Sequence, residues 1–347
     1  MSWCGVEGHD EVVDHFRTSL LRGRLASTFL FVGRSGIGKR LFALRLAQAL
    51  LCKRSNEAKF EPCLACEACV QIEAASHPDV EVVGKPADKS FIPIKTFIGD
   101  REHRNREGLC HRISLKPSQG NRRIAIIDDA DHLNQEGANC LLKTLEEPPP
   151  NAVLILIGTS EQTQLPTIRS RCQTIRFRPL EPSFIQHYLV EQNLAADAEQ
   201  ATELSYLSQG SLDQAIEFSD QALSEFREEL WTIIGQDHDI DSVALAKIVS
   251  SFVDGAGKEA PKRRQRLRHV IRLFLMIFRQ QLFQTVDAPP PSQGRLGQMT
   301  QPVPEALTES VQNRIDRSLL ALGEVDANAN LATLVECWID ELYAPIA

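Results

Sequence analysis

A glycine-rich loop between an apolar segment and a helix-forming segment constrains this chain more than any other feature. The apolar run Phe29–Val32 leads into Gly33-Arg34-Ser35-Gly36-Ile37-Gly38-Lys39-Arg40, and the helix-forming segment Leu41–Leu51 follows. In such a loop, glycines let backbone N–H groups surround an anion, a lysine adds a point charge and the next helix adds its dipole. The sequence therefore predicts a phosphate-binding loop, with contacts from Gly33, Gly36, Gly38 and Lys39.

The loop departs from the common phosphate-binding pattern at its last position. The pattern G-x-x-x-x-G-K normally continues with Ser or Thr, whose hydroxyl binds Mg²⁺. This chain has Arg40 there, so a cation stands where the metal would bind. The sequence alone leaves ATP binding by this loop open, and it counts against hydrolysis.

Length and composition favour a protein of several domains. The 347 residues are 24% charged and 43% hydrophobic, enough for two or three domains with a buried core. The formal net charge of −8 argues against a basic nucleic-acid binder. No apolar run has the roughly 20 residues needed to span a membrane, and the start MSWCGVEGHDE does not have the character of a signal peptide. We expect a cytoplasmic protein whose nine cysteines are reduced or bind metal.

Four cysteines follow the loop and its helix. Cys63, Cys66 and Cys69 have the spacing C-x2-C-x2-C, and Cys52 lies upstream of them. Four thiolates suit a closed tetrahedral Zn²⁺ site, which would hold a small knuckle together. An iron–sulfur cluster uses similar spacing but usually a differently placed fourth ligand. We expect structural zinc, with unrelated buried cysteines as the alternative.

Acidic residues follow an apolar strand in the middle of the chain. Ile124–Ile127 ends in Asp128-Asp129-Ala130-Asp131, typical of a buried parallel strand whose tip presents carboxylates. After a phosphate-binding loop, this pattern predicts that Asp128 is the acid associated with Mg²⁺ and that Asp129 replaces the base that orients water. Many ATPases of this kind have Glu there. The shorter Asp misplaces the carboxylate by about 1 Å, at a cost of about 10²-fold in rate. An ordinary strand with an acidic turn is the alternative.

Alternating helical and strand-like segments predict an α/β fold with a parallel sheet. The helix Asn134–Glu147 is stopped by three prolines. Thr159 follows an apolar strand and would join the other site residues, because ligands bind at the C-terminal ends of parallel strands. Beyond Pro179 only helical periodicity is found. The expected strands are Thr28–Val32, Asp79–Val83, Ile124–Ile127, Ala152–Gly158 and Gln173–Phe177.

Two basic stretches are open to more than one interpretation. The first either lines a nucleic-acid path or forms a solvated helix face, and its interleaved acids favour the solvated face. It carries Lys95, Arg101, Arg104, Arg106, Arg112, Lys116, Arg122 and Arg123. The second, Lys262–Phe283, is amphipathic, and a loop at Ala288–Pro304 follows it. Its basic residues Lys262, Arg263, Arg264, Arg266 and Arg268 are expected to form a solvated end, and its apolar face to pack on neighbouring helices through Leu267, Val270, Ile271, Phe274 and Phe278.

Several motifs together resemble the bacterial clamp loader subunits of the AAA+ class. They are Gly33–Lys39, the four cysteines, Ile127–Asp131, Asn139–Pro149 and Ser170-Arg171-Cys172, in matching order and spacing. The resemblance covers residues 1–215 and extends more weakly over the remaining helices. It implies an AAA+ P-loop domain at 1–178 with a zinc knuckle inserted near 52–70, a helical lid at 179–237 and a helical collar domain at 238–347.

The resemblance also implies partners. Clamp loaders of this family are five-part spirals that open a sliding clamp and close it on primed DNA, within the DNA polymerase III holoenzyme. The expected partners are the motor ATPase and delta subunits, the sliding clamp and, through the assembled complex, primed DNA. Arg171 matches the arginine that reaches into a neighbouring subunit's ATP site as an arginine finger. An arginine that pairs locally with an acid is the alternative.

Three departures distinguish the chain from the active motors of that family. They are Arg40, Asp129 and Asp213, the last of which replaces a sensor arginine after Gly210-Ser211. Because Ser170–Cys172 is intact, the chain most resembles the delta-prime branch, a stator that donates a finger but does not hydrolyse ATP. One alternative is an active motor ATPase of the gamma or tau kind. Another is a zinc-dependent DNA-binding protein, whose DNA affinity would depend steeply on salt.

Overall fold

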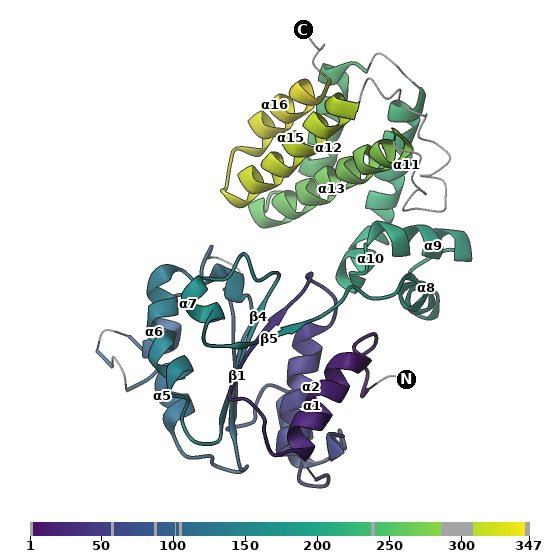
Figure 1. The fold of residues 1–347 in the computed structure, drawn as a ribbon. Coiled ribbons are helices and arrows are strands. Elements are labelled where there is room, and N and C mark those ends of the chain that lie inside the picture. Colours follow the sequence, from purple (N-terminus) through teal and green to yellow (C-terminus); the bar gives the residue numbers. More distant parts are fainter. Residues whose placement is uncertain are drawn as a thin grey trace. The chain divides into compact units, whose positions relative to one another are not determined.

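A computed structural model describes residues 3–56, 59–86, 89–100, 102–103, 106–236, 240–285 and 308–343. The chain divides into two compact units, residues 1–181 and 182–347. The first contains a sheet with helices and the second contains only helices among its described residues, so the predicted α/β class and the helical C-terminal part are confirmed (Figure 1). The finer division into domains at 178 and 237 stays a prediction.

The described part of the first unit forms a parallel sheet of five strands in the order β2-β3-β4-β1-β5. The central strand β1 pairs with β4 on one side and β5 on the other. Both β1 and β4 are buried along their whole length, as expected for apolar strands covered on both faces. The strands are β1 Thr28–Val32, β2 Val80–Val83, β3 Arg123–Ile127, β4 Ala152–Gly158 and β5 Gln173–Arg176.

Helices cover both faces of this sheet (Figure 1). Successive strand residues point to opposite faces, so Phe31 of β1 packs against Phe42 of α2, with ring centroids 5.8 Å apart. The adjacent Leu30 belongs to the core that also contains Leu141 of α6. The helices of this unit are α1 Asp10–Leu21, α2 Lys39–Leu51, α3 Glu67–Glu73, α4 Lys95–Ile98, α5 Leu109–Ser114, the 3-10 helix η2 Ala130–His132, α6 Gln135–Glu146 and α7 Pro166–Arg169.

The second unit is built from helices that pack through apolar faces. The face predicted to pack on neighbouring helices, from Leu267 to Phe278, is fully buried, and the ring of Phe274 lies 5.0 Å from that of Trp338. The predicted loop Ala288–Pro304 lies outside the described residues. The helices are α8 Pro182–Glu191, α9 Ala198–Leu207, α10 Leu212–Phe218, α11 Gln221–Gln236, α12 Ser242–Asp254, α13 Ala260–Thr285, α15 Thr308–Asp326 and α16 Leu331–Tyr343.

The basic end of α13 is held by partners within this unit. Lys262 pairs with Glu259 at 3.1 Å and Arg268 with Asp326 at 2.7 Å. Arg266 donates from Nη1 to the carbonyl oxygen of Phe252 at 3.1 Å. Arg263 pairs with Asp254. Within the part of the chain that the structure describes, no helix is long and apolar enough to cross a membrane.

Candidate nucleotide site and metal centre

The glycine-rich loop joins β1 to α2 through three glycines with positive φ. Gly33, Gly36 and Gly38 have φ of 152°, 73° and 93°. A Cβ atom on Gly33 would lie 2.6 Å from the carbonyl oxygen of Phe177 and 2.7 Å from Cδ1 of Ile37. Both the backbone conformation and the close approach therefore require glycine at this position.

Lys39 is the first residue of α2, and its side chain turns back into the loop. The side chain is buried, and Nζ donates to the carbonyl oxygens of Gly33, at 2.5 Å, and Arg34. An anion in the loop would thus meet this ammonium and the N-terminal N–H groups of α2. The arrangement suits a phosphate group.

His9 also contacts the loop, although it was not among the predicted site residues. The buried imidazole donates from Nε2 to the carbonyl oxygen of Ile37 at 2.7 Å and packs edge-on against Phe177. Burial lowers the pKa of His9, which favours the neutral ring. No sequence pattern marks this contact, because 28 residues separate the two partners.

Arg40 lies against the acid predicted to assist Mg²⁺. Asp128 follows β3 and donates its N–H to the carbonyl oxygen of Val83 at 2.7 Å. Nη1 of Arg40 is 3.2 Å from Oδ2 of Asp128. Burial and the charge of Asp129 raise the pKa of Asp128, and the charge of Arg40 opposes them. The guanidinium of Arg40 therefore pairs with the carboxylate that a metal ion at this site would need as its anionic ligand.

Thr159 and Asp131 connect the tip of β4 to the loop. The N–H of Gly33 donates to the carbonyl oxygen of Thr159 at 3.2 Å. The N–H of Thr159 donates to Asp131 at 2.8 Å, and the hydroxyl of Thr163 donates to the same carboxylate at 2.6 Å. The side chain of Thr159 is exposed at this edge. Asp131 thus organises the site, a role that its place in an acidic run did not indicate.

Asp129 stands in the left-handed region, with φ of 55°, and precedes η2. Its exposed side chain faces Gly84, where an added Cβ would lie 3.6 Å from Oδ2 of Asp129. The loop, Lys39, Arg40, Asp128, Asp129 and Thr159 are therefore gathered at the C-terminal edge of the sheet. Together they fit a phosphate group. They do not fit Mg²⁺, because position 40 lacks a hydroxyl and Asp128 is paired.

The third departure, Asp213, belongs to a helix N-terminus in the second unit. The hydroxyl of Ser211 accepts the N–H of Gln214 at 3.2 Å and caps α10. Asp213 is in the first turn, where a carboxylate interacts favourably with the helix dipole. This explains an acid at this position locally, and its effect on a bound phosphate stays a prediction.

Arg171 lies near the N-terminal end of β1, whereas the loop follows the C-terminal end of that strand. Thr28, the first residue of β1, donates its hydroxyl to the carbonyl oxygen of Arg171 at 2.8 Å. Gly33 follows the other end of β1, and a strand of this length spans about 16 Å. Arg171 and the phosphate-binding loop of its own chain therefore lie at different ends of this strand.

The guanidinium of Arg171 is held by groups of its own chain. Nε donates to Oε1 of Glu146 at 2.7 Å, and Nη2 donates to the same oxygen. Nη1 donates to the carbonyl oxygen of Thr167 at 3.0 Å and to the hydroxyl of Ser170 at 3.1 Å. The side chain is 29% exposed. In the single chain, Arg171 thus forms the local acid pair named above as the alternative.

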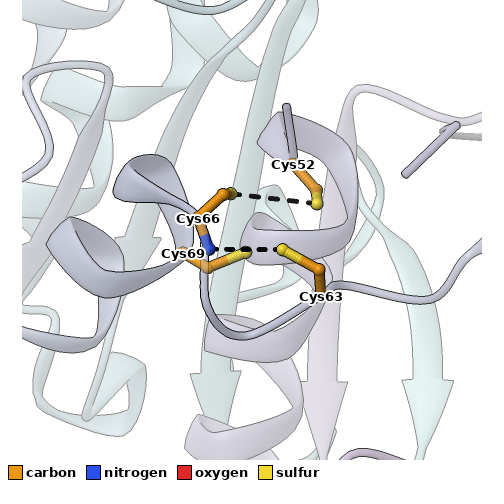
Figure 2. Close-up of side chains that lie close together, drawn as sticks. All are labelled: Cys52, Cys63, Cys66 and Cys69. Carbon is orange, nitrogen blue, oxygen red and sulfur yellow. Dashed lines mark hydrogen bonds between the residues drawn. The ribbon is translucent and has the colours of Figure 1, made fainter. Parts of the chain in front are cut away.

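The four predicted cysteines come together in a cluster (Figure 2). Their Sγ atoms lie within 4.8 Å of one another, and those of Cys52 and Cys66 are 3.9 Å apart. Four sulfurs at about 2.3 Å from a tetrahedral zinc ion would be ~3.8 Å apart. Cys52 directly follows α2 and Cys66 directly precedes α3, so an ion here would join the two helices. The cluster can bind a metal ion, and its geometry fits zinc.

Hydrogen bonds favour the thiolate form of two of these cysteines, Cys52 and Cys66. The N–H of Cys66 donates to Sγ of Cys63 at 3.3 Å. Burial opposes ionisation of Cys66, but hydrogen bonds, first from the backbone of Cys69, outweigh it and lower the pKa of Cys66 to about 6. Similar bonds lower the pKa of Cys52 against its burial, whereas burial raises the pKa of Cys69. Metal binding would favour thiolates throughout.

The basic stretch between residues 95 and 123 is not one helix face. It contains the two short helices α4 and α5 with connecting turns. Arg112 pairs with Glu81 of β2, with Nε 2.6 Å from Oε2. Arg123 lies 3.7 Å from Asp79 and donates from Nε to the carbonyl oxygen of Lys116 at 3.2 Å. Arg101 and Arg104 lie outside the described residues.

Comparison with known proteins gives a family for the first unit. Residues 8–181 match the family described as "DNA polymerase III, delta subunit". The delta' subunit of DNA polymerase III from Bacillus subtilis is 34% identical over 177 residues, 51% of this chain and 50% of that protein. The tau subunit from Escherichia coli is 29% identical over 228 residues, 64% of this chain and 33% of that protein.

Among solved structures, a DNA polymerase III gamma-subunit-related protein of Thermotoga maritima matches with a TM-score of 0.42 and 18% identity. The match covers 94% of this chain and 98% of that one. The chain spans half the length, or less, of the two curated relatives above.

Proposed function

Because the chain belongs to the DNA polymerase III delta-subunit family, we propose that it is a clamp loader subunit of the replicative DNA polymerase III holoenzyme. In this proposal it is a stator, which supplies Arg171 to the ATP site of a neighbouring subunit and does not hydrolyse ATP itself. Its partners are the motor ATPase and delta subunits. It meets the sliding clamp and primed DNA within the assembled complex.

The position of Arg171 carries this proposal. The residue lies about one strand length from its own phosphate-binding loop, at the other edge of the sheet. An arginine finger must contact the transferred phosphoryl group directly. Arg171 can therefore serve only a nucleotide held by another chain, which is what a subunit within a ring or spiral requires.

The loop of this chain supports the second part of the proposal. Arg40 pairs with Asp128, and Mg²⁺ lacks both the hydroxyl and the free carboxylate that it would need. Binding of a phosphate group or a nucleotide at Gly33–Lys39 is compatible with this arrangement. Turnover is not. The four-cysteine knuckle would hold one structural zinc ion and take no part in the chemistry.

The test compares ATP hydrolysis by the isolated chain and by the reconstituted clamp loader. The isolated chain should show no turnover above that of Lys39→Ala. In the complex, Arg171→Ala should slow single-turnover hydrolysis at the neighbouring site by about 10³-fold or more. Arg169→Ala is the matched control, because Arg169 is an exposed arginine two residues before Arg171, at the end of α7.

Each result has a clear consequence. Lysine-dependent turnover by the isolated chain would make the protein an active motor of the gamma or tau kind. An unchanged rate in the Arg171→Ala complex, with assembly intact, would refute the finger.

A further inference from the structure

Glu146 stands where local electrostatics disfavours a carboxylate. It is the last residue of α6, and the C-terminal end of a helix carries partial negative charge. Its carboxylate is 49% exposed and accepts two N–H groups of Arg171 through one oxygen. The cation of Arg171 compensates for the unfavourable position, so the two residues act as a pair.

Acceptor groups of the same chain occupy the edges of the Arg171 guanidinium that would bind a phosphate. An arginine contacts phosphate through two parallel N–H groups on one edge of its planar group. Glu146 takes the edge formed by Nε and Nη2, and Thr167 and Ser170 take the donors of Nη1. Four of the five N–H donors are therefore engaged within the chain. A phosphoryl group that binds through two parallel N–H groups therefore has to displace at least one of these acceptors.

The charge of Glu146 adds to this competition. A guanidinium paired with a carboxylate is nearly neutral toward an approaching phosphate, and the carboxylate itself repels that phosphate. If the pair stayed closed, Arg171 would supply little stabilisation to the developing charge. The finger acts only after its contact with Glu146 has been exchanged for the neighbour's phosphoryl group.

We propose that Glu146 holds Arg171 in a resting position and competes with the phosphoryl group of the neighbouring site, which makes Glu146 a positioning residue for the finger. The proposal rests on the function proposed above. An exposed pair of this kind is weak, so the competition is small enough for assembly and ATP binding to overcome it. Breaking it should change the rate by about two- to fivefold.

The experiment uses the reconstituted clamp loader with Glu146→Gln, which keeps the shape of the side chain and removes its charge. Single-turnover hydrolysis at the neighbouring site should become two- to fivefold faster. Glu147→Gln is the matched control: it removes the same charge from the next residue, which is also exposed, and should leave the rate unchanged. The double variant Glu146→Gln/Arg171→Ala should match Arg171→Ala alone, because Glu146 acts only through Arg171.

A second measurement reports on the pair itself in the free chain. In NMR spectra, exchange of the Nε proton of Arg171 with water should be faster in Glu146→Gln than in Glu147→Gln. A slower or unchanged rate of hydrolysis in Glu146→Gln would overturn the competition, the slower rate meaning that Glu146 orients the finger. If Arg171→Ala has no effect, the proposed function itself fails, so the two failures are distinguishable.

Discussion

Two aspartates, one at the start of β2 and one at the end of β3, show how neighbouring groups set the pKa of a carboxylate. Asp128 follows β3, where burial and Asp129 raise its pKa. Asp79 precedes β2 and is buried, yet it accepts the N–H groups of Ser118, Gln119 and Gly120 at 2.6, 2.7 and 2.9 Å. Burial raises the pKa of Asp79, but these three donors outweigh burial and lower it below its ordinary value of 3.8.

Asp79 should therefore stabilise the fold in a pH-dependent way. Replacement by Asn keeps the shape but removes the charge that three N–H groups share, so Asp79→Asn should lower the free energy of unfolding at pH 7 by about 3 kcal/mol. Because the pKa of Asp79 is lower in the folded chain, its stabilisation is full above about pH 4 and is lost as the pH falls through the folded pKa.

Urea denaturation of Asp79→Asn and of wild type, at pH values between 7 and 3, measures this difference. The exposed Glu136 of α6 provides the control substitution Glu136→Gln, which should cost much less. A difference between wild type and Asp79→Asn that did not shrink with falling pH would refute the charge-based account.

At the scale of single residues, the sequence predicted the residues of the site better than the contacts that hold them in place. Gly33, Lys39 and Asp128 belong to patterns of fixed spacing, so their convergence at one edge of the sheet could be expected. The contact of His9 with Ile37 and the bonds from Asp131 to Thr159 and Thr163 join residues far apart in sequence. Such contacts depend on how elements pack, which no local pattern encodes.

At the scale of elements, predictability followed burial. β1 has the bounds of the predicted strand Thr28–Val32, since all five residues face a packed layer. The stretch from 95 to 123 has no such pattern, and its division into two short helices was not predicted. Arginines of this stretch pair with acidic residues outside it, as Arg112 does with Glu81 of β2. An interpretation from charge alone could not have identified those partners.

The four-cysteine knuckle is the element whose formation should depend most on a ligand. α3 has only seven residues, too few to be stable alone, and it is tied to α2 by Gln48, which donates to the carbonyl oxygen of Cys69 at 2.8 Å. Cys66→Ser should reduce zinc from about one ion per chain to well below it. The loss should cost at least about 2 kcal/mol, or ~4–8 °C in the unfolding midpoint.

Metal analysis and thermal unfolding of the purified protein test this prediction. Cys337→Ser is the control, because Cys337 is an exposed cysteine of α16 outside the cluster. Equal zinc contents in Cys66→Ser and wild type would show that the ligand assignment is wrong. An iron–sulfur cluster would reveal itself by iron and visible absorption.

At the scale of the whole molecule, charge decides what the chain can bind alone. The net charge is −8, and arginines of the stretch that could line a nucleic-acid path are paired with acids, Arg112 with Glu81 and Arg123 with Asp79. A net negative charge of this size weakens the attraction of the whole chain to a polyanion such as DNA. In the proposed function the DNA-binding surface would be completed by several subunits together.

The isolated chain should therefore bind primed DNA weakly, with a dissociation constant of about 10⁻⁴ M or higher near physiological salt, and its affinity should change little with salt. Fluorescence anisotropy of labelled primed DNA, titrated at about 50 and 200 mM salt, measures both quantities. The reconstituted clamp loader with its clamp and ATP is the positive control for the same DNA. A loss of about 10³-fold or more between the two salt concentrations would mean six or more phosphate contacts by this chain alone. That result would overturn the stator as the full account of the protein and favour a zinc-dependent DNA-binding role for the first unit.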